Sequence, residues 1–232
     1  MAELTGSEIL AKSLKNEGVD VLFFLMGGPM LLAESSCIKE GIRPLDVRHE
    51  QSAAFMAKAY SRLLQKPGVC MAASGPGTIN LPTGIANALI DCSPVLAIGG
   101  SSPIGQNGRG VFQEIDQLAI MKPCTKWADR VYNIKRIPEM VNFAFQKAMS
   151  GKPGPVYLDF PGDILYGKIP EEQVDWSLSG RPLLEARPLG DPSKVDALVD
   201  AIAKAKQPII LSGSGVIWSR AWPELQEFVE KN

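Results

Sequence analysis

The sequence predicts an α/β protein with a doubly wound, mainly parallel sheet and helices on both faces. Three observations lead to this prediction. Apolar runs of strand length alternate with segments of helical period, the apolar runs are continuous, and glycine or proline separates most of the segments. Continuous apolar strands are expected where helices cover both sides of a parallel sheet.

The first predicted helix starts from a capping box made by Thr5 and Glu8 and ends at Gly18. The stretch from 101 to 130 is glycine-rich at its start and is expected to be irregular. The other predicted elements of this domain are strands over 19–25, 45–47, 68–74, 94–100 and 155–160, and helices over 30–40, from Glu50, over 78–90 and over 138–149.

The domain organisation follows from a change in composition. We expect a first domain over residues 1–170 and a proline-punctuated, polar linker over 171–190. Residues 191–232 then read as the beginning of a second, incomplete α/β domain, because so few elements cannot close a core. Those elements are a helix over 192–205, a strand over 208–212, a turn over 213–215 and a helix over 220–231.

Composition and charge argue against several classes of protein. Lysine and arginine total 24 against 25 aspartates and glutamates, so the net charge is −1 and we expect no nucleic-acid partner. No apolar run of about 18 residues and no secretory signal are present, so we expect no membrane partner and a cytoplasmic location. The cysteines stand singly, without metal-site spacing; they are Cys37, Cys70, Cys92 and Cys124.

Glu50 lies in a position to meet a ligand. A predicted strand passes into a helix there, and ligands of open α/β sheets bind beyond the carboxyl ends of the strands. A carboxyl group in such a place can accept a hydrogen bond and, when protonated, donate one. Position alone favours the alternative, a surface carboxylate that only caps its helix. His49 is the only histidine, so a mechanism that needs a pair of histidines within these residues is excluded.

Three other segments hold candidate binding residues. Gly75 and Asn80 belong to a glycine-rich turn that permits a tight passage from strand to helix and presents backbone amides. Gly27 lies in a Gly-Gly-Pro loop, and Gln113 lies in a Phe-Gln-Glu segment. Ordinary turns and loops explain these three segments equally well.

Four longer stretches occur together: RHEQSAAFMAKAYSR, KPGVCMAASGPGTINLPTGIANALIDCSPVLAIGG, FQEIDQLAIMKPCTKW and PGPVYLDFP. In order and spacing they resemble the pyrimidine-binding domain of the thiamine diphosphate enzymes of the acetolactate synthase, oxalyl-CoA decarboxylase and 2-hydroxyacyl-CoA lyase family. The resemblance covers essentially residues 3–170. The later stretch AKQPIILSGSGVIWSRAWPELQEF resembles the start of the family's central, Rossmann-like domain.

The resemblance implies roles for the candidate residues. Glu50 matches the glutamate that hydrogen-bonds the pyrimidine ring of thiamine diphosphate and promotes loss of the thiazolium C2 proton. Gly27 matches a loop near the pyrimidine. Gly75 and Asn80 match the family's G-P-G-x-x-N turn, and Gln113 matches the F-Q-E segment that faces the reacting centre from the partner subunit.

The sequence departs from the family at two places. Phe24 and Met26 replace the glycine and proline of an F-G-x-P-G loop, which predicts a reshaped pyrimidine side of the pocket. The segment Gly162-Asp163-Ile164 is not the G-D-G motif that binds magnesium. The resemblance therefore implies Mg²⁺ ligands outside this chain, and it allows FAD or ADP in the central domain.

The resemblance implies a thiamine diphosphate-dependent lyase or decarboxylase that acts on a 2-hydroxyacyl-CoA or a related acyl-CoA, because the runs AIGGSS, EIDQ and PGPVYLDFPGD are closer to that branch. An alternative is an acetolactate synthase-type carboligase of 2-oxo acids. Another is a non-catalytic subunit of a split enzyme, against which the presence of Glu50 argues. The family implies a homodimer or homotetramer with active sites between subunits, so this chain alone is expected to be inactive.

Overall fold

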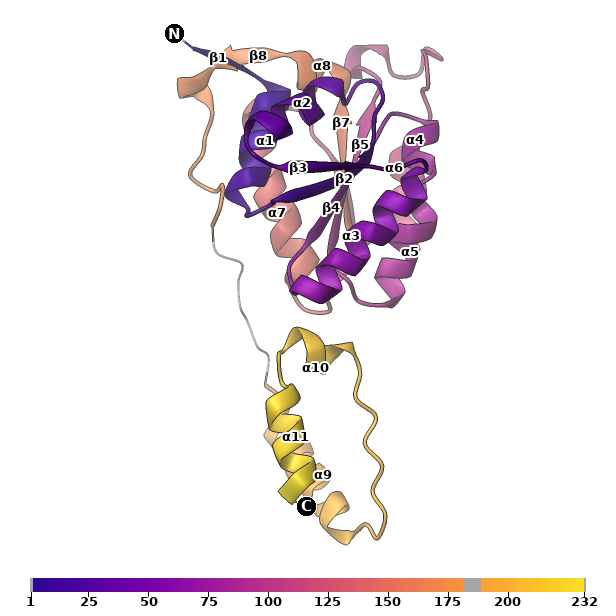
Figure 1. The fold of residues 1–232 in the computed structure, drawn as a ribbon, viewed down its shortest axis with the longest axis vertical. Helices are drawn as coiled ribbons and strands as arrows, with labels where there is room; N and C mark the ends of the chain where they lie inside the picture. Colours follow the sequence, from indigo (N-terminus) through magenta and orange to yellow (C-terminus); the bar gives the residue numbers. More distant parts are fainter. Residues whose placement is uncertain (1, 182–188, 232) are drawn as a thin grey trace. The chain divides into compact units, whose positions relative to one another are not determined.

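The computed structural model describes residues 2–181 and 189–231, and the chain divides into two units whose boundary in the sequence falls between these ranges. The segment 182–188, which makes up part of the predicted linker 171–190, lies outside the described residues. The larger unit contains the main sheet (Figure 1), and every candidate site residue falls within its range.

Six parallel strands form the main sheet, in the order β3-β2-β4-β5-β7-β6. This arrangement, with helices around it, confirms the doubly wound α/β prediction. The chain leaves β2 toward β3 at one edge and then returns to β4 on the other side of β2, so the strand order reverses between β2 and β4. Ligands bind beside such a reversal in open α/β sheets. The strands are β2 (Val21–Leu25), β3 (Arg43–Asp46), β4 (Gly68–Ala72), β5 (Val95–Ser101), β6 (Trp127–Arg130) and β7 (Val156–Pro161).

Helices cover both faces of this sheet (Figure 1). The pleat of the strands divides the core between the faces: in β4, Val69 and Met71 pack with α1, α2 and α7, whereas Cys70 and Ala72 pack with α3 and α5. The helices of this unit are α1 (Gly6–Asn16), α2 (Leu31–Lys39), α3 (Glu50–Leu64), α4 (Pro76–Ile79), α5 (Pro82–Ile90), α6 (Gln117–Met121), α7 (Ile137–Met149) and α8 (Gly162–Tyr166).

The capping box at the start of α1 is confirmed. The amide of Glu8 donates to Oγ1 of Thr5 at 3.2 Å, and the amide of Thr5 donates to Oε2 of Glu8 at 2.8 Å. This backbone hydrogen bond from Thr5 lowers the pKa of Glu8. The sequence did not predict the small antiparallel sheet that β1 (Glu3–Thr5) forms with β8 (Lys168–Pro170).

Two elements of the larger unit differ from the prediction. The irregular stretch 101–130 contains α6 and the edge strand β6, whose residues are all half-buried because β6 pairs only with β7. The single helix predicted over 78–90 is two helices, α4 and α5. Pro82 has no amide hydrogen to continue the first helix and stands at the start of the second.

The smaller unit consists of helices without a strand in its described residues. The strand predicted over 208–212 is wrong: the segment has no regular secondary structure, and Ile209 and Leu211 are 87% and 94% exposed. A strand needs a neighbour for its hydrogen bonds, and no described segment pairs with these residues. Across both described ranges, no helix combines the length and the apolar character needed to cross a membrane. The helices are α9 (Pro192–Lys204), α10 (Ser214–Trp218) and α11 (Trp222–Lys231).

The cysteines differ in accessibility, which predicts a labelling pattern. Burial raises the pKa of the Cys37 and Cys70 thiols to about 12, whereas Cys92 is only half-buried. At a pH of about 8, close to the ordinary thiol pKa, a disulfide reagent should label Cys92 in the folded protein. Cys37 and Cys70 should react only after denaturation, as counted by mass spectrometry. Labelling of Cys70 as fast as Cys92 would contradict this arrangement.

Candidate cofactor site

The turn after β4 has a backbone conformation that requires glycine. Gly75 has φ 57° and ψ −113°, and a Cβ there would lie 2.3 Å from the carbonyl oxygen of Gln113. Pro76 then starts α4, where no amide donor is needed, and Asn80 ends it as the C-cap residue. The turn is therefore fixed between the end of the strand and the loop that carries Gln113.

Glu50 lies at the start of α3 with 7% of its surface exposed. The neighbouring residue His49 caps α3, because its Nδ1 accepts a hydrogen bond from the amide of Gln51 at 3.2 Å. Nδ2 of Asn80 donates to Oε2 of Glu50 at 2.9 Å. The alternative of an exposed, helix-capping carboxylate is therefore wrong, and the structure brings together two predicted site residues that are thirty positions apart.

The second oxygen of Glu50 lies beside a floor of small residues. A Cβ on Gly77 would lie 3.3 Å from Oε1 of Glu50 and 3.1 Å from Cβ of Ala73, so a larger residue would crowd the carboxylate. Within the described part of the chain, no hydrogen bond reaches Oε1. This oxygen is therefore available to accept or share a hydrogen bond with a ligand, and Gly77 keeps a side chain away from it.

Of the other predicted residues, Gln113 contacts Ser74, and Gly27 lies beside Ala73, whose Cβ would be 2.6 Å from a Cβ added to Gly27. Oγ of Ser74 lies 2.8 Å from Oε1 of Gln113 and 3.2 Å from the carbonyl oxygen of Gly28, and its single proton can serve one of them at a time. Gly27 follows β2 and accepts the amide of Met30 at 2.9 Å. The ends of β2 and β4 and the Gln113 loop thus converge on one side chain.

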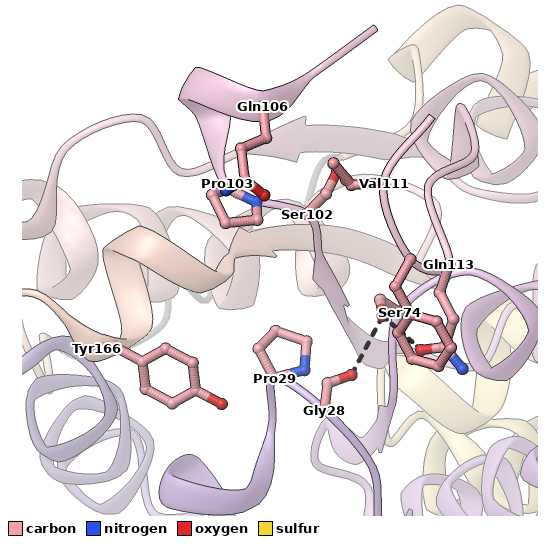
Figure 2. A pocket seen from close by; sticks show the side chains of 10 residues that line it. Gly28, Pro29, Ser74, Ser102, Pro103, Gln106, Val111, Gln113 and Tyr166 are labelled. Atoms are coloured by element: carbon pink, nitrogen blue, oxygen red, sulfur yellow. Dashed lines mark hydrogen bonds between the residues drawn. The ribbon is translucent and has the colours of Figure 1, made fainter. Parts of the chain in front are cut away.

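A cavity of about 270 Å³ opens at this convergence (Figure 2). It lies at the carboxyl ends of β2, β4 and β5, as expected for a doubly wound sheet. Gln113 lines it and Glu50 does not, so the two predicted catalytic residues face different spaces. Its lining consists mostly of apolar groups with a few polar ones: Gly28, Pro29, Ser74, Ser102, Pro103, Gln106, Val111, Phe112, Gln113 and Tyr166.

The two replaced loop positions have different surroundings. Phe24 is 5% exposed and belongs to the hydrophobic core on the α1 side of the sheet, whereas Met26 is 58% exposed. Neither side chain lines the cavity. The larger Phe24 is therefore accommodated by the core, and it does not narrow the cavity.

The described residues contain no group of three or more His, Cys, Asp or Glu side chains that could hold a metal ion. Asp163, in the segment that departs from the family's magnesium motif, has a structural contact: its carboxylate accepts the amide of Ile104 at 3.1 and 3.2 Å. It thereby holds the loop after β5 against the start of α8.

Sequence reasoning missed one residue of the site. Gln117, at the start of α6, is 1% exposed, and its Oε1 accepts the amide of Gly75 at 2.9 Å. No local signal distinguishes this glutamine, because its other side-chain partners, Tyr157 and Asp159, follow forty residues later.

The fold and this site agree with a family comparison. A sequence model described as "Thiamine pyrophosphate enzyme, N-terminal TPP binding domain" matches residues 4–120, which include Glu50, the Gly75 turn and Gln113. The chain belongs to the thiamine pyrophosphate enzymes, and the resemblance inferred from its motifs is confirmed.

Several relatives are similar over nearly the whole chain. The probable acetolactate synthase large subunit of Methanocaldococcus jannaschii is 37% identical, over 98% of this chain and 39% of that protein. The 2-hydroxyacyl-CoA lyase of Arabidopsis thaliana is 35% identical (98% and 40%), and the oxalyl-CoA decarboxylase of Escherichia coli K12 is 34% identical (97% and 40%). The chain thus spans about two fifths of the length of these relatives. Their names cover different reactions at similar identity, which supports the family and leaves the substrate open.

Proposed function

We propose that the whole protein is a thiamine diphosphate-dependent lyase or decarboxylase, and that this domain binds the pyrimidine ring of the cofactor. One observation carries the proposal: the buried carboxylate of Glu50 has one oxygen held by Asn80, and its other oxygen, beside Gly77, has no hydrogen bond among the described residues. A ring nitrogen of the cofactor could meet Oε1, because Gly77 puts no side chain against that oxygen and it has no hydrogen bond among the described residues.

The residues of this chain would divide the work as follows. Glu50 exchanges a proton with the ring nitrogen, and Asn80 holds Oε2 so that Oε1 keeps its direction. Since Glu50 is only 7% exposed, bulk water competes little for the hydrogen bond at Oε1. Thiamine diphosphate, when bound, supplies an electron sink for breaking or forming a carbon–carbon bond next to a carbonyl group.

Gln113 and the cavity would serve the substrate. Ser74 lies against Oε1 of Gln113, and within the described residues no hydrogen bond uses Nε2 of that glutamine. Its amide nitrogen can therefore donate to a substrate oxygen. The apolar walls around it suit the carbon chain of a small acyl group.

Further partners belong to the same proposal. Mg²⁺ would be bound by residues outside this chain, and FAD or ADP is a candidate ligand of the central domain. The working enzyme would be a homodimer or homotetramer whose active sites lie between subunits. The family membership supports each of these assignments, because all follow from the domain plan that the sequence resembles.

The substrate is proposed to be a 2-hydroxyacyl-CoA or a related acyl-CoA. The whole enzyme, with thiamine diphosphate and Mg²⁺, should cleave oxalyl-CoA or a 2-hydroxyacyl-CoA with a higher kcat/KM than it shows for pyruvate. Product analysis by liquid chromatography measures both reactions in one assay. A higher kcat/KM for pyruvate, with acetolactate as the product, would contradict the acyl-CoA assignment.

That opposite result would establish the second candidate, an acetolactate synthase-type carboligase of 2-oxo acids. The relative from Methanocaldococcus jannaschii, with 37% identity, supports this candidate as well as the lyase and decarboxylase relatives support the first. If the protein turned over none of these substrates and bound no cofactor, the remaining candidate would be the non-catalytic subunit of a split enzyme.

A further inference from the structure

A buried polar cluster lies directly beneath the Gly75 turn, and the proposed function does not use it. It joins α6 to the ends of β5, β6 and β7. Its members are Gln117, Tyr157, Asp159, Arg130 and Ser101. Tyr157 and Asp159 are 0% exposed, and Gln117 is 1% exposed. Burying so many polar groups costs free energy unless each has a hydrogen-bond or ion-pair partner. The side chains are therefore restricted to arrangements in which these partners are present.

We propose that Gln117 is a positioning residue for the cofactor site: it fixes the Gly75 turn and, through α4, the hydrogen bond from Asn80 to Glu50. The proposal rests on the proposed function, in which Glu50 and Asn80 face the pyrimidine ring. Gln117 does not touch the open oxygen of Glu50, and its effect would pass through the backbone of the turn.

The side-chain amide of Gln117 has one favourable orientation. Its Oε1 faces a donor, the amide of Gly75, at 2.9 Å. Its Nε2 faces three acceptors: the carbonyl oxygen of Gly100 at 2.7 Å, the hydroxyl of Tyr157 at 2.8 Å and Oδ1 of Asp159 at 2.6 Å. Two hydrogens shared among these acceptors satisfy Nε2, whereas a flipped amide would turn its oxygen toward the carboxylate.

The partners of Gln117 are themselves held. The hydroxyl of Tyr157 donates to Oδ1 of Asp159 at 2.8 Å, and Oγ of Ser101 donates to Oδ2 at 2.7 Å. Burial, and then the neighbouring carboxylate, raises the pKa of Tyr157, so this phenol keeps its proton. Arg130 forms an ion pair with Asp159 from the neighbouring strand. The buried cluster therefore offers Gln117 a rigid set of acceptors.

The path from Gln117 to Glu50 is short. Gly75 is the N-cap residue of α4, which has only four residues, and the amide of Asn80 donates to the carbonyl oxygen of Pro76 at 3.1 Å. Nδ2 of Asn80 then binds Glu50. A helix of one turn has few hydrogen bonds of its own, so a change at Gly75 moves Asn80.

The test compares the whole enzyme carrying Gln117→Met with the wild type. Methionine has a similar length, and its thioether sulfur is only a weak acceptor for the Gly75 amide. We expect hydrogen exchange of the backbone amides across Gly75–Asn80 to become about two- to tenfold faster. This factor corresponds to the net free energy of one hydrogen bond. We expect kcat with saturating cofactor to fall about ten- to a hundredfold, because small misplacements at a reacting centre have effects of that size.

The matched control is Asn142→Leu, which removes a buried amide on α7, on the other face of the sheet. It should lower the melting temperature while the exchange of the turn and kcat stay at wild-type values. Tyr157→Phe, which removes one acceptor of Gln117 and keeps the ring, should give the same changes as Gln117→Met at smaller amplitude. If Gln117→Met does not fold, the same measurements on Tyr157→Phe test the proposal.

Two results would overturn the proposal. One is wild-type exchange and wild-type kcat in folded Gln117→Met or Tyr157→Phe. The other is the same loss in Asn142→Leu, which would reduce the effect to general destabilisation. Amide exchange reports on the turn even if Glu50 has no part in catalysis. A wild-type kcat in Glu50→Gln would therefore contradict the proposed function separately.

Discussion

The whole enzyme carrying Glu50→Gln should turn over about 10²- to 10⁴-fold more slowly than the wild type, the usual contribution of a proton-transferring side chain. Glutamine keeps the size of the side chain and can still accept the hydrogen bond of Asn80, but it cannot exchange a proton with a ring nitrogen. The measurement is kcat at saturating thiamine diphosphate and Mg²⁺, so that a change in cofactor affinity does not enter.

Glu8→Gln is the control for this change. Glu8 is also a hydrogen-bonded carboxylate, but it lies in the capping box of α1, where glutamine is accepted. It should retain wild-type turnover. Equal activity of Glu50→Gln and the wild type would show that Glu50 has no role in the reaction.

Asp159→Asn should lower the free energy of unfolding by about 3–5 kcal/mol, as expected when one partner of a buried ion pair is removed. Asp159 is fully buried, and the side chain of Arg130 is 14% exposed. Asparagine preserves the shape and leaves the guanidinium without its counter-charge. Urea denaturation followed by circular dichroism measures the change.

Glu171→Gln provides the comparison for an exposed pair. Glu171 lies 3.0 Å from Lys12, and the two side chains are 44% and 40% exposed. Solvent screens such a pair, so its loss should change the free energy of unfolding by no more than about 1 kcal/mol. If Asp159→Asn and Glu171→Gln changed the free energy of unfolding by similar amounts, burial would not explain the stability that the Arg130–Asp159 pair contributes.

The inner strands of the parallel sheet could be predicted because β2, β4, β5 and β7 are mostly apolar runs with clear punctuation. The edge strand β6 could not, since Trp127–Arg130 mixes aromatic and charged residues and pairs on one side only. The segment 208–212 shows the opposite error: an apolar run has strand propensity, but a strand also requires a partner, and none lies beside it among the described residues. Pairing is a tertiary property, which a local pattern does not contain.

The site was predicted unevenly for a similar reason. Glu50 and Asn80 came from motifs that the family resemblance joins, and the structure adds their hydrogen bond and the burial of the carboxylate. Gln117 came from no motif. Its importance depends on contacts to Gly75, in the turn after β4, and to Asp159, in β7, and single-sequence reasoning has no signal for such contacts.

The central claim is that Glu50 activates thiamine diphosphate bound to this domain. The most direct measurement is the rate at which the C2 hydrogen of the bound cofactor exchanges with deuterium oxide, followed by quenching and nuclear magnetic resonance on the whole enzyme. We expect exchange to be much faster than in free thiamine diphosphate and to lose most of that acceleration in Glu50→Gln. Equal exchange rates in the wild type and Glu50→Gln, with cofactor bound to both, would contradict the claim.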